Sequence, residues 1–539
     1  MTQHERTSGW APLRRPLFRD RWLASIVSNL GSWMQDTAGT WLMAMLTSSP
    51  LLIALMQTAA SLPILLLGLL AGATADIFDR RRLLLFWQTW MLVTVAVLSV
   101  LTLTGTIGPW TLLGLTFLLN VGSAMNNPAW QAIVPELVPR SELPDAIALN
   151  SAGFNLARAV GPALGGLAVA IFHSVRMGAG MVFVLNSLSF LAVIWVLYAW
   201  KRTPLFKSAL PSERILGSIR AGFRYVRHTP VLQAVLLRVL LFGTFASAVW
   251  ALLAVVAREQ LHLGAVGFGA LNGCLGAGAV LGAIAMPRVR HRVGAELIAA
   301  ICAVVFAATM LVLAYSGSLP LIVLWLILAG GAWTSALSTM NTAMQLSVPA
   351  WVQARALGTY QMIFAGGMAL GSALWGALAD RASSRAALTA SAIGILLTLP
   401  VLRRLPLMRG TPPDLTPFVA NRPAPLMVIK PDPEEGPVLI TIEYRIGPED
   451  LDEFTRLIHE LGRIRMRDGA VRWGVFQDTA NAERLVETFV TDSWLDFLRA
   501  RERMTAEDRI VRDQIRRLHQ GSSDPQVSRM IYVSERDRV

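Results

Sequence analysis

GFNLARAVGPALGG, residues 153–166, lies inside the fifth of twelve long apolar runs in this 539-residue chain. Its small residues recur at helical spacing, which gives a helix one smooth face, and Pro162 gives that helix a weak point. A second stretch, GATADIFDRRR at residues 72–82, ends the second apolar run with a charged turn. Together the two stretches predict closely packed helices with charged ends.

The composition indicates a membrane protein. Hydrophobic residues make up 54% of the sequence, charged residues only 15%, and the mean hydropathy is +0.50. A helix needs about twenty apolar residues to cross the hydrocarbon core. We count twelve such runs, at 22–46, 51–75, 83–104, 110–133, 146–172, 177–200, 231–257, 265–287, 295–316, 320–345, 356–379 and 386–402. The first 22 residues lack the pattern of a removable signal peptide.

Charge divides the chain into two parts. Residues 1–410 hold 29 Lys and Arg against 12 Asp and Glu, whereas residues 411–539 hold 19 against 23. The basic residues lie between the apolar runs, with 15 in the loops that we place inside and four in those that we place outside. This bias predicts cytoplasmic termini, and it favours a lipid bilayer over nucleic acid as the partner.

A long basic loop separates the runs into two sets of six. We expect the following parts: a cytoplasmic N-terminus at 1–21, helical halves at 22–200 and 231–402, a cytoplasmic loop at 201–230, a linker at 403–437 and a cytoplasmic domain at 438–534. GPALGG at 161–166 is echoed by GSALWG at 371–376, which suggests a duplication. Duplicated halves are typical of alternating-access transporters. Small residues, however, recur in any helical bundle.

These motifs resemble the major facilitator superfamily of secondary transporters. The antiporter motif of that superfamily is matched strictly at Gly161, Pro162, Gly165 and Gly166, with Gly153 and Ala157 as further small positions. LGSWMQ at 30–35, ADIFDRRR at 75–82 and NNPA at 126–129 resemble the enterobactin exporter group, also called transmembrane secretion effectors. The resemblance implies efflux of a siderophore, drug or secondary metabolite by proton antiport across a bacterial inner membrane.

The same resemblance implies a charged gate after the second helix. Its residues are Gly72, Asp76, Asp79, Arg80, Arg81 and Arg82. Asp76 would bind the N-terminus of a neighbouring helix, or an arginine, because a carboxylate is favoured at the positive end of a helix. Ile77 and Asp79 depart from the superfamily pattern, and the matching loop of the second half has no acidic residue, so the latch is expected on one side only. Alternatively, the arginines serve orientation alone.

Asp36 is the acidic residue of the membrane part that lies well inside a run. Burying a carboxylate there is costly unless it is protonated or paired, so Asp36 is the candidate proton carrier. Arg158, inside the antiporter motif, would pair with Asp36 or hold an anionic substrate. The alternatives are a structural hydrogen bond for Asp36 and a side chain that reaches toward the headgroups for Arg158.

Further polar residues are candidates for the substrate cavity. They are Gln35, Gln57, Asn120, Asn155 and Arg238. Each asparagine could instead bond a neighbouring helix, and Arg238 could extend toward the headgroups. We expect no metal and no cofactor, because Cys274 and Cys302 resemble core residues and no phosphate-binding loop is present. ATP is therefore not expected to drive the protein.

The C-terminal part has a different pattern. Residues 411–437 hold eight prolines and predict an extended linker. Strands are expected at 438–445, 471–478, 484–490 and 527–533, with helices at 448–467 and 493–519. This βαββαβ order predicts a small α+β ferredoxin-like domain. It resembles the dimeric domains of antibiotic-biosynthesis monooxygenases, which implies a possible homodimer.

Two other classes of function compete with transport. His459, Trp473 and Trp494 could border a pocket of a membrane-anchored monooxygenase-like enzyme, but no nucleophile, metal set or cofactor motif accompanies them. A ligand sensor acting through the same domain is the third class. We favour the transporter, not an enzyme, with a dimerising or sensing C-terminal domain.

Overall fold

The computed structural model describes residues 10–139, 141–200, 222–290, 292–349, 351–405, 407, 414–416 and 431–533. The expected N-terminal segment, cytoplasmic loop and linker therefore lie partly outside the described residues. The chain forms two compact units, which are considered separately. Unit 1 holds residues 1–211, 236–341 and 358–407, and unit 2 holds residues 212–235, 342–357 and 408–539.

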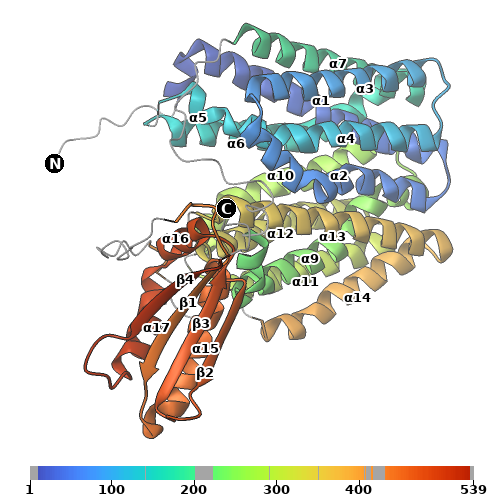
Figure 1. The fold of residues 1–539 in the computed structure, drawn as a ribbon. Coiled ribbons are helices and arrows are strands. Elements are labelled where there is room, and N and C mark those ends of the chain that lie inside the picture. Colours follow the sequence, from blue (N-terminus) through green and yellow to red (C-terminus); the bar gives the residue numbers. More distant parts are fainter. Residues whose placement is uncertain are drawn as a thin grey trace. The chain divides into compact units, whose positions relative to one another are not determined.

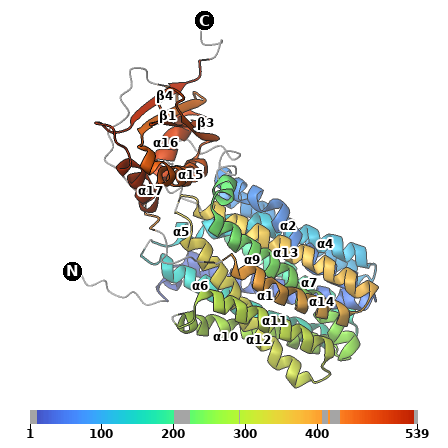
Figure 2. The same cartoon turned by 90° about the horizontal axis from the view of Figure 1, so that it is seen from below.

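The first half of the chain forms six long helices, which run side by side (Figures 1 and 2). They are α1 (Pro16–Leu46), α2 (Pro50–Ile77), α3 (Arg80–Leu103), α4 (Pro109–Ala132), α6 (Leu143–Ile171) and α7 (Val175–Ala199). Prolines at the first turns of α1, α2, α4 and α6 suit those positions, because the first turn needs no backbone donor. We call the end of the bundle at which α1 begins the N-terminal face, and the end at which α1 stops the opposite face.

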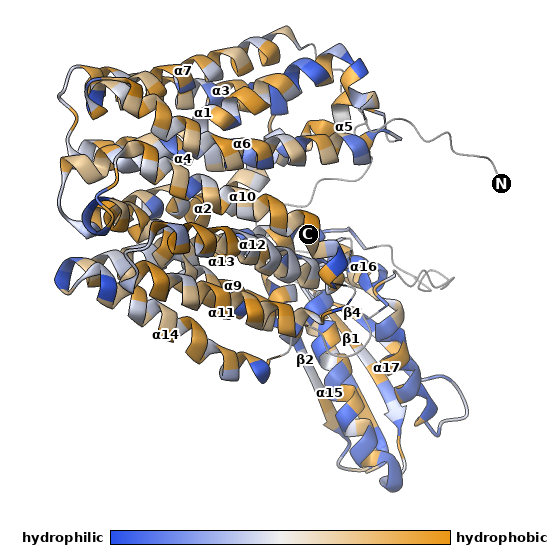
Figure 3. Ribbon diagram, turned by 180° about the vertical axis from the view of Figure 1, so that it is seen from behind, coloured by the Kyte–Doolittle hydropathy of each residue, from blue (hydrophilic) through white to orange (hydrophobic). Residues whose placement is uncertain are grey.

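The second half contributes six more helices. They are α9 (Pro230–Val255), α10 (Ala265–Arg290), α11 (Ala295–Tyr315), α12 (Leu319–Leu346), α13 (Gln353–Arg381) and α14 (Ser384–Arg403). A π-helical turn, Val256–Gln260, continues α9. Each of the twelve predicted runs thus coincides with a helix, and hydrophobic residues follow these helices along most of their length (Figure 3).

By length and composition, nine helices of the described chain could cross a membrane. The three others are α14, whose apolar part is short, and α1 and α4, in which amide and hydroxyl side chains recur along the helix. Polar residues in a transmembrane helix usually face the interior of the bundle rather than lipid. The polar character of α1 and α4 therefore fits helices that line an internal site.

The two similar stretches, GPALGG at 161–166 in α6 and GSALWG at 371–376 in α13, make similar helix contacts. A Cβ atom on Gly161 would lie 2.5 Å from an atom of α1, and one on Gly371 would lie 2.1 Å from an atom of α9. Likewise, Gly166 closely approaches α10, and Gly376 closely approaches α2. Each helix therefore packs on the first helix of its own half and on the second helix of the other half, as expected for a duplicated bundle.

The C-terminal part of unit 2 forms a four-stranded antiparallel sheet with helices. Its elements are β1 (Val438–Arg445), α15 (Leu451–Asp468), β2 (Arg472–Gln477), β3 (Arg484–Thr491), α16 (Trp494–Arg503), α17 (Ala506–Arg517) and β4 (Gln526–Ile531). The strand order is β2–β3–β1–β4, so the predicted small α+β domain is confirmed. The second predicted helix is in fact two, because Thr505 and Asp508 form a capping box that starts α17.

A buried carboxylate lies in the core of this domain. Glu487 on β3 is fully buried and accepts hydrogen bonds from Tyr444 Oη at 3.2 Å, Arg465 Nε at 3.2 Å and Trp473 Nε1 at 3.1 Å. Burial and the adjacent Glu487 carboxylate raise the pKa of Tyr444. The cluster therefore keeps a neutral hydroxyl and a paired ion inside the domain.

We expect Glu487→Ala to lower the free energy of unfolding of this domain by about 3 kcal/mol, because it leaves the Arg465 guanidinium without its partner. Urea unfolding of residues 430–539, followed by tryptophan fluorescence, measures the change. Glu483→Ala, at an exposed position one residue before β3, is the control and should change stability by less than about 0.5 kcal/mol. Equal stability of both variants would contradict the prediction.

Candidate functional site

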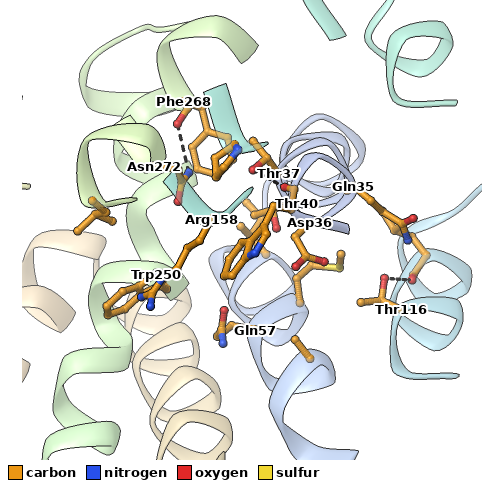
Figure 4. Close-up of a pocket in the computed structure, with 18 of the residues that line it drawn as sticks. Gln35, Asp36, Thr37, Thr40, Gln57, Thr116, Arg158, Trp250, Phe268 and Asn272 are labelled. Carbon is orange, nitrogen blue, oxygen red and sulfur yellow. Dashed lines mark hydrogen bonds between the residues drawn. The ribbon is translucent and has the colours of Figure 1, made fainter. Parts of the chain in front are cut away.

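A cavity of about 110 Å³ lies inside unit 1 and takes side chains from both halves (Figure 4). Its lining comes from α1, α2, α3, α4, α6 and α7 of the first half and from α9 and α10 of the second. The polar lining residues are Gln35, Asp36, Thr37, Thr40, Gln57, Thr116, Arg158 and Asn272. The aromatic lining residues are Trp33, Phe183, Trp250 and Phe268.

An acidic and a basic residue line this cavity. Asp36 comes from the middle of α1 and Arg158 from the middle of α6. In the described part of the chain, neither side chain has a hydrogen bond or an ion pair, although the Arg158 guanidinium lies 5.9 Å from the centre of the Trp33 ring. Charged groups at such depth are stabilised by water, a proton or a ligand. The arrangement suits a ligand with a polar or charged group and an apolar part that packs against the aromatic side chains.

Two of the expected amides also line the cavity. Gln35 is buried, and its Oε1 accepts a hydrogen bond of 2.6 Å from Asn186 Nδ2. Gln57 donates to Ser61 Oγ at 3.1 Å, one turn further along α2. Both amides therefore combine a place in the lining with a structural bond that fixes their orientation.

The two asparagines expected in the cavity are not among its lining residues. Asn120 Nδ2 donates to the Thr116 carbonyl, and Asn155 Nδ2 donates to the Ser151 carbonyl, both at 2.9 Å. One N–H of each amide is thus bonded to the preceding turn of its own helix. An asparagine inside a membrane helix needs no partner from elsewhere when such a bond is available.

Arg238 also lies outside the central cavity, contrary to expectation. It borders a second cavity of about 280 Å³ between helices of the second half. Its buried guanidinium is 2.8 Å from Glu296 and donates to carbonyl oxygens of Leu402 and Leu405 at the end of α14. A cation at a helix C-terminus satisfies the last carbonyls and the helix dipole. Arg238 therefore acts as a cap.

The charged turn after α2 has a similar capping geometry. Asp79 Oδ1 accepts from the backbone nitrogen of Arg82 at 2.9 Å and begins α3. Arg80 donates to a carbonyl near the end of α4, and Arg81 donates to two carbonyls at the end of α7. No heavy atom lies within 4 Å of a Cβ built on Gly72. The side chain of Asp76 lies outside the described residues, so its latch stays a prediction.

The antiporter motif contributes to three different contacts. Gly153, Gly161 and Gly165 face α1, and Ala157 is buried in the same half. Gly166 faces α10 of the other half, and Pro162 lines the central cavity. One helix, α6, thus connects packing within its half, contact between halves and the cavity wall.

Sequence reasoning missed several residues. Trp33, Trp250 and Asn272 line the cavity, and Arg21, taken as part of the cytoplasmic N-terminus, is buried in α1 with its guanidinium 4.3 Å from the centre of the Trp130 ring. Arg21 was missed because α1 begins at Pro16, six residues before the predicted run. The glycines of α10, spaced by four and three residues, could have indicated a close helix contact.

The residues that could border a pocket of an enzyme are placed in the C-terminal domain. His459 and Trp473 contact each other edge to face at 5.3 Å, whereas Trp494 packs against Phe497 in the core. In the described residues, no group of three or more His, Cys, Asp or Glu could hold a metal ion.

Two six-helix halves around a shared cavity are the fold of major facilitator transporters. The chain is similar to the nucleoside transporter NupG (TM-score 0.58, 14% identity, 72% of this chain and 98% of that one). It is also similar to an inward-facing bacterial homologue of the human lysosomal transporter Spinster (TM-score 0.57, 13% identity, 73% and 96%). At these identities, the likeness defines the fold alone.

The family is defined by sequence. The model described as "Transmembrane secretion effector" matches residues 7–538, and the chain belongs to that family. It is 28% identical over 400 residues to the multidrug efflux pump Tap of Mycolicibacterium fortuitum, covering 72% of this chain and 95% of the relative. It is 26% identical over 422 residues to the enterobactin exporter EntS of Shigella boydii serotype 4 (strain Sb227), covering 74% and 95%. The protein is thus a multi-pass membrane transporter.

Proposed function

We propose that this protein exports an amphipathic small molecule, such as a siderophore, drug or secondary metabolite, in exchange for protons. The observation that carries the proposal is the cavity shared by both halves, in which Asp36 and Arg158 lie beside aromatic side chains. Aromatic walls suit the apolar part of such a molecule, and the two charges suit its polar groups. The names of Tap and EntS, a multidrug efflux pump and an enterobactin exporter, support efflux as the direction.

The proposed mechanism is alternating access. The halves would move against each other around a fixed site, so that the cavity opens to one face at a time. Asp36 would take up a proton when the cavity meets the more acidic side and release it on the other side. Arg158 would pair with ionised Asp36 or with an anionic group of the substrate. Substrate and proton would then use the site in turn.

The proposed location is a bacterial inner membrane with both termini in the cytoplasm. The N-terminal face carries the basic turn at Arg80–Arg82, and basic loops stay on the cytoplasmic side. The opposite face would then be the outer one. This orientation lets a proton gradient directed inward drive export.

Proteoliposomes with an imposed pH gradient test the proposal. Loss of a siderophore or a dye from the interior should depend on the gradient and on the protein. Turnover of a substrate by the isolated C-terminal domain without a gradient would favour the enzyme. Binding without movement of any compound in the panel would favour the sensor.

We also expect residues 430–539 to fold alone and to self-associate, while deletion of this segment leaves residual transport. Val438, Ile440 and Ile442 of β1 point into the core, so Leu439 lies on the other face of the sheet, paired with Val490 and Met530. A sheet with one uncovered apolar face tends to acquire a cover.

Light scattering gives the mass of the isolated domain. Met530→Glu should yield a folded monomer, because it places a charge in the middle of the proposed interface. The control is Ile510→Glu, which places the same charge at an exposed position of α17. A monomeric parent domain, or equal dissociation in both variants, would refute the dimer.

A further inference from the structure

We propose that Arg258 is an outer gate latch, which joins the two halves at the opposite face and must release before the cavity can open there. Its Nη1 donates to the carbonyl oxygens of Ala44 and Thr47, the latter at 2.8 Å. Both carbonyls belong to the last turn and the C-cap of α1. A helix of one half is therefore capped by an arginine of the other half. The inference rests on the proposed alternating access.

The segment that carries Arg258 has an unusual backbone. Val256–Gln260 form a π-helical turn at the end of α9, and His262 follows with φ of 51°. Single π turns occur often at functional sites, and a left-handed histidine is uncommon. Such conformations persist where the surrounding structure holds them in place. Here the contacts include the bonds from Arg258 to α1 of the other half and a bond of 3.2 Å from Gln260 Nε2 to Ser384 Oγ of the same half.

A second polar bond joins the halves at the same face. Ser49 Oγ, at the start of α2, lies 2.6 Å from Asp380 Oδ1 at the end of α13. Beneath these two bonds, α6 and α10 meet through Gly166 and Gly269, and the contact continues to Ala159 and Gly276. Nearer the N-terminal face, Gly153 of α6 packs on α1 of its own half instead. The described structure is thus closed at the opposite face.

Arg258 is the stronger part of this closure. Hydrogen bonds with a charged donor or acceptor contribute more than neutral ones, and the Arg258 guanidinium makes two of them to the other half, whereas the Asp380 carboxylate accepts one. Their loss should favour opening of this face by about tenfold or more. Arg381 also lies at this face, in the last turn of α13, and is exposed. It offers a control with the same charge.

Cysteine labelling tests the latch without any substrate. With Cys274 and Cys302 replaced by alanine, Ile53→Cys places one thiol in the cavity lining, one turn inside Ser49. An impermeant maleimide is added to right-side-out membrane vesicles. Arg258→Ala should raise the labelling rate about tenfold, Arg258→Lys less, and Arg381→Ala should leave it unchanged. An unchanged rate in Arg258→Ala, or an equal rise in Arg381→Ala, would overturn the proposal.

A crosslink tests the same closure if Arg258→Ala fails to fold. The variant Ser49→Cys/Asp380→Cys also carries the reporter cysteine at position 53. Oxidation, which joins positions 49 and 380, should lower the labelling of position 53 to background until a reductant is added. Undiminished labelling of the crosslinked protein would refute closure at this face. If labelling responds as expected in both tests but no compound is exported, the latch stands and the proposed export function fails.

Discussion

Asp36→Asn is expected to reduce gradient-driven export to the level of protein-free vesicles while the protein remains folded and abundant. The amide fills the same volume as the carboxylate, but it cannot take up and release a proton. Folding should be preserved because the described residues give Asp36 no hydrogen bond or ion pair that the substitution would break. Efflux from proteoliposomes with an imposed pH gradient measures the effect, and gel filtration in detergent checks the fold.

Asp20→Asn is the matched control, because Asp20 is an exposed acid of the same helix. Its transport should equal that of the parent protein. If transport and its pH dependence survive in Asp36→Asn, Asp36 has a structural role. Arg158→Lys examines the proposed partner, since lysine keeps the charge but loses the forked geometry of the guanidinium.

The helices could be predicted because about twenty apolar residues in a row leave a membrane chain few alternatives. Their ends were less certain. The structure extends α1 to Pro16, through the charged residues Arg19 and Asp20, because a helix continues beyond its apolar part where polar side chains can reach water. The break before α17 was overlooked, although Thr505 and Asp508 have the spacing of a capping box.

The site was harder to predict than the fold. Sequence gives the depth of a residue in the membrane, which singled out Asp36 and, together with the antiporter motif, Arg158; both line the cavity. It does not tell whether a polar side chain already has a partner. Asn120 and Asn155 bond their own helices, and Arg238 caps α14, so all three are satisfied away from the central cavity. The asparagine bonds are local and the bonds of Arg238 are tertiary, but the sequence does not show whether either kind forms.

The role of α10 in the site could not be predicted without the structure. Its glycines indicate that some helix comes close, but the sequence does not identify which one. The structure identifies α6, and it brings Asn272 of α10 into the cavity lining. The helix contact and part of the cavity wall are therefore on the same helix. A change in the contact should also change the shape of the cavity.

Gly269→Leu is expected to abolish export by preventing closure of the opposite face. A Cβ at this position would lie 2.7 Å from the Pro162 carbonyl oxygen and 2.9 Å from Gly166 Cα. Both neighbours are backbone atoms of α6, so they cannot turn aside as a side chain could, and α6 and α10 must separate. Overpacking of this kind costs about 3 kcal/mol at the upper end of its range, which lowers the closed population about a hundredfold. Labelling of a cysteine at position 53 by the impermeant maleimide should therefore rise while export stops.

Gly114→Leu on α4 is the control, because no heavy atom lies within 4 Å of a Cβ there, and its export and labelling should match the parent protein. Normal export by a folded Gly269→Leu protein would show that the halves need not meet at this contact during transport.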